Sequence, residues 1–321
     1  MSEQRLSDRR RRPDAATVLQ PAPQAGSAAA GQEPAAARAV TPGSTSVLRS
    51  FARHRLGLAG LALIAALVLF CFAGPVLYHT DQVHASIMAT NLPPGSGRPL
   101  GTDANGYDIL GRLMVGGQSS LEIGFAVAVL ATIIGVIWGA AAGFAGGLAD
   151  AIMMRIVDIV LAIPAIFLLI YLASVFRPTV GLLIVVVSLL SWLVPARLVR
   201  GDVLTLRTRE FIAAVRTMGG RGPHIVLRHL VPNAFGTIVV SATFQIADAI
   251  ILLATLSFLG FGLPPPAATW GGMLSQGTTY LLDGYWWEVY PAGLIIMLTV
   301  IAFSLVGDAL RDCLDARLRQ Y

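Results

Sequence analysis

The sequence predicts an all-α membrane protein with six transmembrane helices. Of its 321 residues, 55% are hydrophobic and only 13% are charged, a balance too apolar for a soluble domain of this length. The apolar residues also gather in stretches of about 20, the length that a helix needs to cross the roughly 30 Å hydrocarbon layer of a bilayer. Such stretches lie at residues 56–78, 119–143, 152–173, 180–199, 237–258 and 290–307.

The basic residues predict which side of the membrane each loop faces, because they favour the cytoplasmic side in short loops. All 23 of them are arginines. If the N-terminus is cytoplasmic, the inner segments hold nine arginines up to Arg55, seven in residues 197–228 and three after residue 310, whereas the outer segments hold only three. We therefore expect both termini in the cytoplasm.

Residues 1–48 differ in composition from the rest of the chain. They are rich in Ala, Pro, Gln, Gly and Arg and hold almost no large apolar residue, so they cannot bury enough surface to offset chain entropy. We expect a disordered cytoplasmic tail, whose arginines favour contact with anionic lipid headgroups over a twin-arginine export signal. Beyond it we expect a first helix with an external loop (49–118) and a core transmembrane domain (119–321) that contains a polar loop (203–235).

The sequence lacks the residues on which several chemistries depend. It contains no lysine, which excludes the phosphate-binding loop G-x-x-x-x-G-K-[ST], so the chain does not hydrolyse ATP by that route. The five histidines form no H-E-x-x-H motif and no cluster with cysteine. His79 and His84 share a loop with Asp81, and two interpretations stay open there, a metal site or solvated side chains. We expect no catalytic residue, no metal site and no cofactor in this chain.

A polar segment rich in arginine separates two apolar spans at residues 210–234. Apolar residues recur at helical spacing in its first half, at Ile212, Val215 and Met218. Gly219, Gly220, Gly222 and Pro223 then break the helix. A second short helix is expected from about His224 to just before Pro232. The segment is either an interfacial linker or a docking site for a soluble partner. Its glycine break and arginine density favour docking.

This segment resembles the cytoplasmic coupling loop of permeases in ATP-binding cassette (ABC) importers, where a short helix docks into a cleft of a separate ATPase subunit. The family signature has E-A-A, three residues, a glycine and, further on, a proline. Here Ala213-Ala214-Val215, Gly219 and Pro232 match it, and an R-H-x-x-P-N ending starts at Arg228. Because alanine stands in place of the signature's glutamate, we expect Glu210 to supply part of that charge.

Other segments are similar to the permeases of dipeptide, oligopeptide and nickel importers. Pro99–Arg112, PLGTDANGYDILGR, resembles their G-T-D-x-x-G-x-D-x-L-x-R element. Leu256–Gly262, LSFLGFG, resembles L-S-F-L-G-L-G, and the pair Trp270-Gly271 matches a W-G element. Gly307–Asp312 matches G-D-x-L-R-D. The resemblance covers about residues 50–320 in the family's order.

The resemblance implies a type I ABC importer permease fold with a cytoplasmic coupling helix, in the inner membrane of a bacterial cell. It implies a permease for dipeptides or oligopeptides that forms the translocation path with a second homologous permease. Its further partners would be one or two P-loop ATPase subunits carrying ATP and Mg²⁺, an extracytoplasmic substrate-binding protein and the lipid bilayer, with no nucleic acid. The implied ATPase-coupling residues are Glu210, Ala213, Ala214, Val215, Arg216, Met218, Gly219, Gly220, Arg221, Arg228, His229 and Pro232.

Three other functions are alternatives to peptide import. Within the same family the cargo would be nickel or another small solute. An ion-driven secondary transporter would need several intramembrane charges and no docking loop for an ATPase. A membrane-embedded enzyme would need a cluster of nucleophile, base or metal ligands, which the sequence does not present.

Asp248 is the main candidate for the substrate path, because it lies about midway along the span at 237–258 and charges inside a span face a partner or water. Ser241 and Gln245 precede it at positions that place all three on one helix face. This stripe either lines the translocation cavity or makes structural hydrogen bonds to another helix. Relatives commonly carry an acidic residue where Leu253 stands. Either Asp248 supplies that negative charge from another position on the helix, or the cargo of this chain differs from theirs.

Two further patterns concern helix packing. Glycines recur every four residues on one expected helix face at Gly135, Gly139, Gly143 and Gly147, and such a face allows the close approach of a neighbouring helix. The neighbour belongs either to this chain or to a second permease. Arg155 and Asp158 are three residues apart, and we expect them to neutralise each other near the inner interface.

Overall fold

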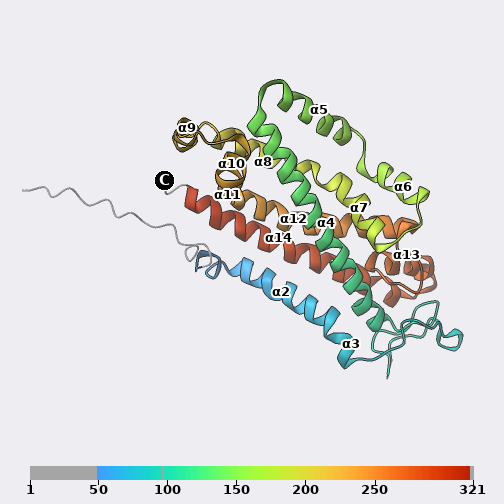
Figure 1. Ribbon diagram of the computed structural model, residues 1–321. Coiled ribbons are helices and arrows are strands. Elements are labelled where there is room, and N and C mark those ends of the chain that lie inside the picture. Colours follow the sequence, from blue (N-terminus) through green and yellow to red (C-terminus); the bar gives the residue numbers. More distant parts are fainter. Residues whose placement is uncertain (1–48, 96, 319–321) are drawn as a thin grey trace, which may run out of the picture. The chain divides into compact units, whose positions relative to one another are not determined.

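The computed structural model describes residues 49–95 and 97–318, so the expected tail at 1–48 lies outside the described residues. These residues form helices and turns, with no strand among them (Figure 1). The longer helices are α2 (Arg55–Phe72), α4 (Ile109–Ala145), α5 (Gly147–Ala162), α6 (Ala165–Val175), α7 (Val180–Ser191), α8 (Leu193–Leu206), α12 (Phe235–Leu256), α13 (Trp270–Tyr280) and α14 (Tyr290–Leu318). The shorter elements are α3 (Gly74–Leu77), η1 (Ile87–Ala89), α9 (Glu210–Thr217), α10 (Gly222–Ile225), η2 (Val226–Leu230), α11 (Val231–Asn233), η3 (Ser257–Phe261), η4 (Leu281–Asp283) and η5 (Trp286–Glu288).

Four helical segments of the described chain are each long and apolar enough to cross a membrane, namely α2, α4, Phe235–Phe261 and Trp286–Leu314. The other two expected spans are bent pairs of helices: α5 and α6 meet at 81°, and α7 and α8 meet at 43°. The count is six if each bent pair is one span. Prolines explain the bends, since Pro164 forces the preceding Ile163 into an extended conformation and Pro195 lacks the amide that would bond to Ser191.

The glycine face of α4 packs against α8 of the same chain, which decides between the two neighbours considered above. A Cβ on Gly135 would lie 3.0 Å from the backbone nitrogen of Ala196, and one on Gly139 would lie 3.1 Å from the nitrogen of Arg200. Gly143 would meet the carbonyl oxygen of Arg200 at 3.0 Å. Gly147 does not belong to this face, because α4 ends at Ala145 and Gly147, with a φ of 54°, starts α5.

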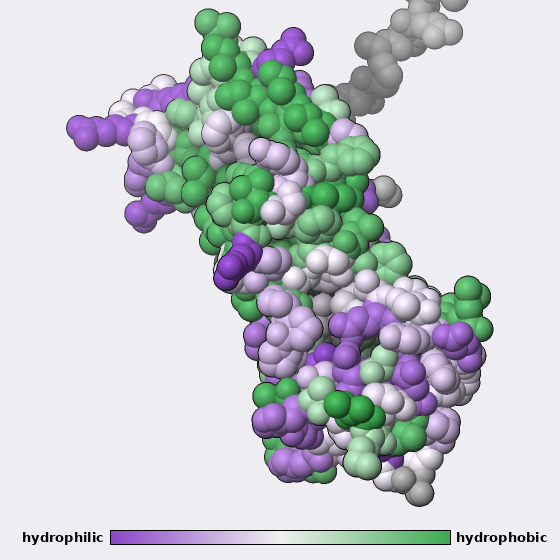
Figure 2. All heavy atoms as spheres, turned by 90° about the vertical axis from the view of Figure 1, so that its right-hand side faces the viewer, coloured by the Kyte–Doolittle hydropathy of each residue, from purple (hydrophilic) through white to green (hydrophobic). Residues whose placement is uncertain are grey.

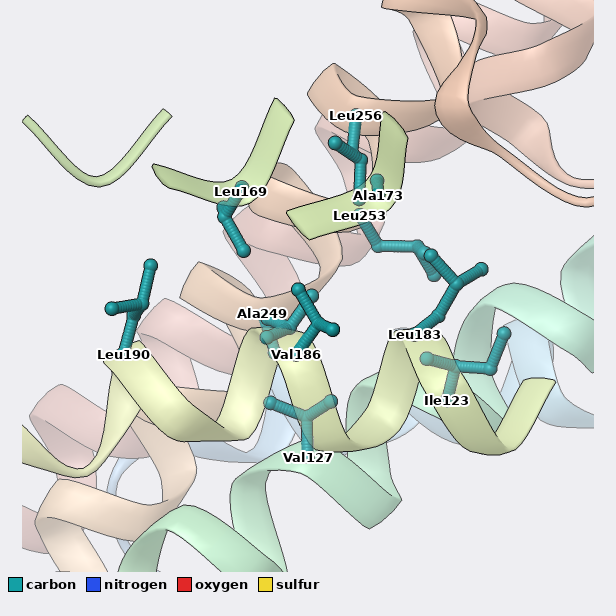
Figure 3. Close-up of a cluster of buried hydrophobic side chains, with 11 residues drawn as sticks. Ile123, Val127, Leu169, Ala173, Leu183, Val186, Leu190, Ala249, Leu253 and Leu256 are labelled. Carbon is teal, nitrogen blue, oxygen red and sulfur yellow. The ribbon is translucent and has the colours of Figure 1, made fainter. Parts of the chain in front are cut away.

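The main hydrophobic core lies where α4, α6, α7 and α12 converge (Figure 3). Ile123 and Val127 of α4 point toward Leu183 and Val186 of α7, with side chains of the other two helices beside them. Leu253 of α12 is part of this cluster and is fully buried. A carboxylate at that position would be buried among apolar side chains without a partner, which accounts for leucine in this packing arrangement.

The surface divides into polar and hydrophobic regions. Figure 2 views the end of the molecule where the loop between α3 and α4 lies, and polar side chains gather in its lower half. Its upper half, at the level of α5 and α6, is mainly hydrophobic. Exposed apolar side chains on these two helices include Ile152, Ile159, Phe167 and Tyr171. Such a surface suits lipid or another apolar protein surface.

The close contact of α4 with α8 leads to a stability prediction. Replacing Gly139 by valine forces α4 away from Ala196 and Arg200, so we expect a lower thermal unfolding midpoint in detergent, from a loss on the order of 1–3 kcal/mol. Gly181→Val is the matched control, since a Cβ there meets nothing within 4 Å. Equal midpoints for the two variants would contradict the packing described.

Candidate functional site

The polar segment at 210–234 forms a compact loop structure at the end of α8. Ile212 of α9, Ile225 of α10 and Leu230 of η2 are fully buried and share one cluster with Val199 and Val203 of α8. The opposite faces expose Phe211, Met218 and Leu227. The amphipathic pattern expected for Ile212 and Val215 is therefore present, whereas Met218 is exposed and does not belong to the buried face.

Gly219 and Gly220 follow the end of α9, and glycine is needed at each position for a different reason. The amide of Gly219 donates to the carbonyl of Arg216 at 3.0 Å, and that of Gly220 donates to Val215 at 2.9 Å. This pair of bonds is a Schellman motif, whose turning residue is left-handed. Gly219 has a φ of 83°, which favours glycine. Gly220 is restricted by space, since a Cβ would lie 2.7 Å from Cγ1 of Val215.

The second half of the loop differs from the expectation. The helical turns begin at Gly222 and continue through Pro232, whereas a helix from His224 to just before Pro232 was predicted. A π-helical turn at Val226–Leu230 precedes the proline. This wider turn fits the ring and missing amide of Pro232 into a continuing helix. Asn233 then donates its side-chain amide to the carbonyl oxygen of His229 at 2.6 Å.

Most of the expected coupling residues are available to a partner. Three are partly buried: Val215, Gly220 and His229. The others are exposed: Glu210, Ala213, Ala214, Arg216, Met218, Gly219, Arg221, Arg228 and Pro232. The guanidinium of Arg216 also lies 5.7 Å from the ring centre of Phe144 at the end of α4, a distance at which a cation–π attraction operates.

The expected polar stripe on α12 is divided between two environments. Ser241 and Gln245 are buried within the chain, whereas Asp248 is exposed. The structure thus leaves Asp248 free to meet water, substrate or another protein, whereas the two neutral residues are not accessible in this chain.

The sequence interpretation missed two ion pairs that connect α5 with α8. Asp150 accepts two hydrogen bonds from Arg200, at 2.5 and 2.8 Å. Asp158 pairs with Arg197, so the expected neutralisation of Asp158 by Arg155 is wrong. The arginines of α8 lie closer to the aspartates of α5 than Arg155 does, because the turn at Gly146 brings α5 alongside α8. The sequence did offer a signal for the second pair, because the acidic Asp158 and the basic Arg197 lie in two consecutive apolar spans.

The loop that precedes α4 is held by the polar residues of the Pro99–Arg112 segment. Asp108 caps α4 by accepting from the amide of Gly111 at 2.8 Å, and the hydroxyl of Tyr78 donates to the same carboxylate. Arg112 is only 3% exposed and donates to the carbonyl of Pro266 at 2.8 Å. Burial raises the pKa of the nearby Asp103. This segment therefore acts as structural support for the loop.

Asp81 and His84 form a local turn. The Asp81 carboxylate accepts from the amides of Val83 and His84 and contacts the His84 ring at 2.8 Å. These hydrogen bonds lower the pKa of Asp81 to about 2. Among the described residues no group of three or more histidine, cysteine or acidic side chains is positioned to hold a metal ion.

Comparison with known proteins assigns the family. A family model described as "Binding-protein-dependent transport system inner membrane component" matches residues 131–320, which is more than half of the chain. The chain belongs to this family. Its members are inner membrane permease components, in agreement with the helical, apolar architecture and its candidate spans. A second model, "N-terminal TM domain of oligopeptide transport permease C", matches residues 44–94.

Two relatives from Bacillus subtilis (strain 168) match most of the permease. The oligopeptide transport system permease protein OppC is 39% identical over 270 residues, which cover 84% of this chain and 88% of the relative. The dipeptide transport system permease protein DppC is 36% identical over 272 residues, which cover 85% of each chain. The similarity therefore extends over nearly the whole length of both relatives.

The glycine turn of the loop leads to a second prediction. Gly219→Val places a branched side chain at a left-handed position, at a cost on the order of 1–2 kcal/mol, whereas Gly219→Asn tolerates that conformation better. Gly220→Val would crowd Val215. We expect both valine variants to speed tryptic cleavage at the exposed Arg216 and Arg221, and the asparagine variant to stay near wild type. Equal cleavage rates in all variants would contradict the Schellman geometry.

Proposed function

We propose that this permease is a transmembrane subunit of an ATP-driven ABC importer and that the loop at 210–234 couples it to separate ATPase subunits. One observation carries the proposal. The loop buries one apolar face on α8 and leaves exposed most of the residues that match the family's coupling signature, together with Phe211 and Met218. An apolar surface flanked by arginines suits a cleft in a soluble protein.

The cargo proposed is a dipeptide or oligopeptide. Support comes from the two relatives, whose names specify oligopeptide and dipeptide transport and whose sequences align over most of this chain. Nickel or another small solute remains the alternative within the family. Asp248, exposed on α12, is proposed to line the translocation path, because a carboxylate inside a span needs water or a partner charge. Ser241 and Gln245 lie on the same helix and are buried within this chain.

The partners proposed are a second homologous permease, one or two P-loop ATPase subunits and an extracytoplasmic binding protein. ATP and Mg²⁺ belong to the ATPase subunits, because this chain has no lysine for a phosphate-binding loop, and no cofactor is assigned to this chain. Both termini are proposed to be cytoplasmic on the basis of the arginine distribution. In Figure 1 the C-terminal end of α14 and the loop of α9–α11 lie at the same end, which agrees with that orientation.

An ion-driven secondary transporter is the rival from another class. The ion pairs of α5 and α8 supply intramembrane charges that such a mechanism could use. The exposed loop at 210–234 favours the ATP-driven proposal, because a secondary transporter has no ATPase to dock.

A single substitution tests the docking. Met218 is 78% exposed on the loop, and Leu282 is 98% exposed in η4, which directly follows α13. In Figure 1, α13 and α9 lie at opposite ends of the helical bundle. Met218→Glu puts a charge into the apolar contact, so we expect at least a tenfold loss of P-loop ATPase subunits that co-purify with the permease from native membranes. Leu282→Glu, the same kind of change, should retain them. Undiminished co-purification with Met218→Glu, or no ATPase with the wild type, would contradict the coupling role.

A further inference from the structure

Glu288 is a buried carboxylic acid side chain without a well-formed hydrogen bond. It is the last residue of η5, shortly before α14, and only 3% of it is exposed. Neither Oε1 nor Oε2 has a hydrogen-bond partner within the described residues, although the amide of Ala104 approaches the carboxyl group. Most buried polar groups in folded proteins are hydrogen-bonded, and an ionised carboxylate without a partner is strongly unfavourable there. An ionised Glu288 therefore does not fit this environment.

A second carboxylate, that of Asp103, lies close enough to repel a charge on Glu288. Asp103 already has partners, since its Oδ1 accepts from the amides of Asn105 and Tyr107, each at 2.9 Å. Nε of Arg112 lies 3.9 Å from its Oδ2. Among the elements packed against η5, α13 and the first half of α14 contribute no charged side chain. One guanidinium thus stands with two carboxylates, and one negative charge is left unbalanced.

Both acids lie in a contact that joins the segment before α4 to the start of α14. Nε1 of Trp287 donates to the carbonyl oxygen of Thr102 at 3.3 Å. η5 also lies against α13, where a Cβ on Gly277 would be 2.7 Å from the carbonyl oxygen of Glu288. Because the side chain of Glu288 is enclosed here, it reaches water only if residues 99–108 move away from η5.

We propose that Asp103 and Glu288 share one proton, and that this proton holds residues 99–108 against η5. A protonated Glu288 is neutral and donates a hydrogen bond, so it suits burial beside an ionised Asp103. The proton belongs on Glu288 because Asp103 has the donors that stabilise a charged carboxylate. Its loss leaves two negative charges close together, and their repulsion drives Glu288 toward water.

The contact is therefore a pH-sensitive switch. It lies near α13, at the opposite end of the helical bundle from α9 (Figure 1). Since it uses none of the coupling residues, the inference does not depend on the proposed function.

The direction of the pH dependence follows from the number of bound protons. When residues 99–108 have moved away, Glu288 is exposed and loses its proton near the ordinary glutamate pKa of about 4.3. Above that pH the closed contact holds one proton more than the open one, until the closed pair itself loses it. Each rise in pH therefore favours the open state, by at most tenfold per pH unit. The contact is firmest in acid and weakens toward alkaline pH.

Hydrogen exchange tests the switch in the full-length permease, within the complex purified from native membranes into lipid nanodiscs. The reporters are the amides of Thr102, Asp103 and Gly106, which donate to the carbonyl oxygens of Leu92, Tyr107 and Asp103. We expect their protection factors, corrected for the intrinsic exchange rate at each pH, to fall at least tenfold from about pH 5 to about pH 8. Equal protection at the two pH values would overturn the inference.

Two variants separate this proton from other effects of pH. Glu288→Gln keeps the shape and a hydrogen-bond donor but cannot ionise, so we expect high protection at both pH values. Asp81→Asn is the control, because Asp81 is an exposed acid whose pKa of about 2 leaves it ionised throughout. It should keep the pH dependence of the wild type. A Glu288→Gln permease that responds to pH as the wild type does would contradict the shared proton.

Asp103→Asn keeps the inference testable if Glu288→Gln does not assemble. Asparagine retains the oxygen that accepts from the amides of Asn105 and Tyr107. The variant leaves one carboxylate with one guanidinium, so an ionised Glu288 is balanced and no proton is needed. We expect protection to change less than threefold between the two pH values. A fall as large as that of the wild type would overturn the inference.

Discussion

The architecture depends on the close approach of α4 and α8 through glycine. Because Gly135, Gly139 and Gly143 carry no side chain, the backbone of α8 lies directly against α4. Arg207 extends the contact, since its Nη1 donates to the carbonyl of Gly143 at 2.9 Å. The contact fixes α8, and α8 carries both the arginines that pair with α5 and the start of the polar loop. One packing constraint therefore positions both the polar loop and the arginines of α8 that pair with α5.

Two groups of charges among the described residues have different physical roles. Arg112 and the Asp150–Arg200 pair are largely buried and have defined hydrogen-bond partners, so they hold segments together. Asp248 and the Asp158–Arg197 pair are exposed within apolar helices. A lipid environment would penalise the second group. Asp248 belongs to the proposed route of the cargo, whereas the buried group explains why the neighbouring helices stay in register.

Much of the fold could be predicted from the sequence, because apolar stretches of about 20 residues are a strong local signal for membrane-spanning helices. The polar loop could also be located, since its glycines and arginines interrupt the apolar pattern. The helix starting at Gly222 and passing through Pro232 could not, because a π-helical turn absorbs the proline and leaves no compositional mark. Likewise, Arg155 is the sequence neighbour of Asp158, but the bend of the chain at Gly146 and Gly147 brings Arg197 closer. A pairing between two helices cannot be predicted from the periodicity of one helix.

The central claim is that this permease serves ATP-driven peptide import. The most direct measurement is uptake of a labelled dipeptide into proteoliposomes that contain the permease, its partner permease, the ATPase subunits and the binding protein. ATP should be supplied on the ATPase side, with and without a proton or sodium gradient. The account predicts uptake that requires ATP and the binding protein and that persists without a gradient. Uptake that needs an ion gradient and proceeds without ATP would contradict it.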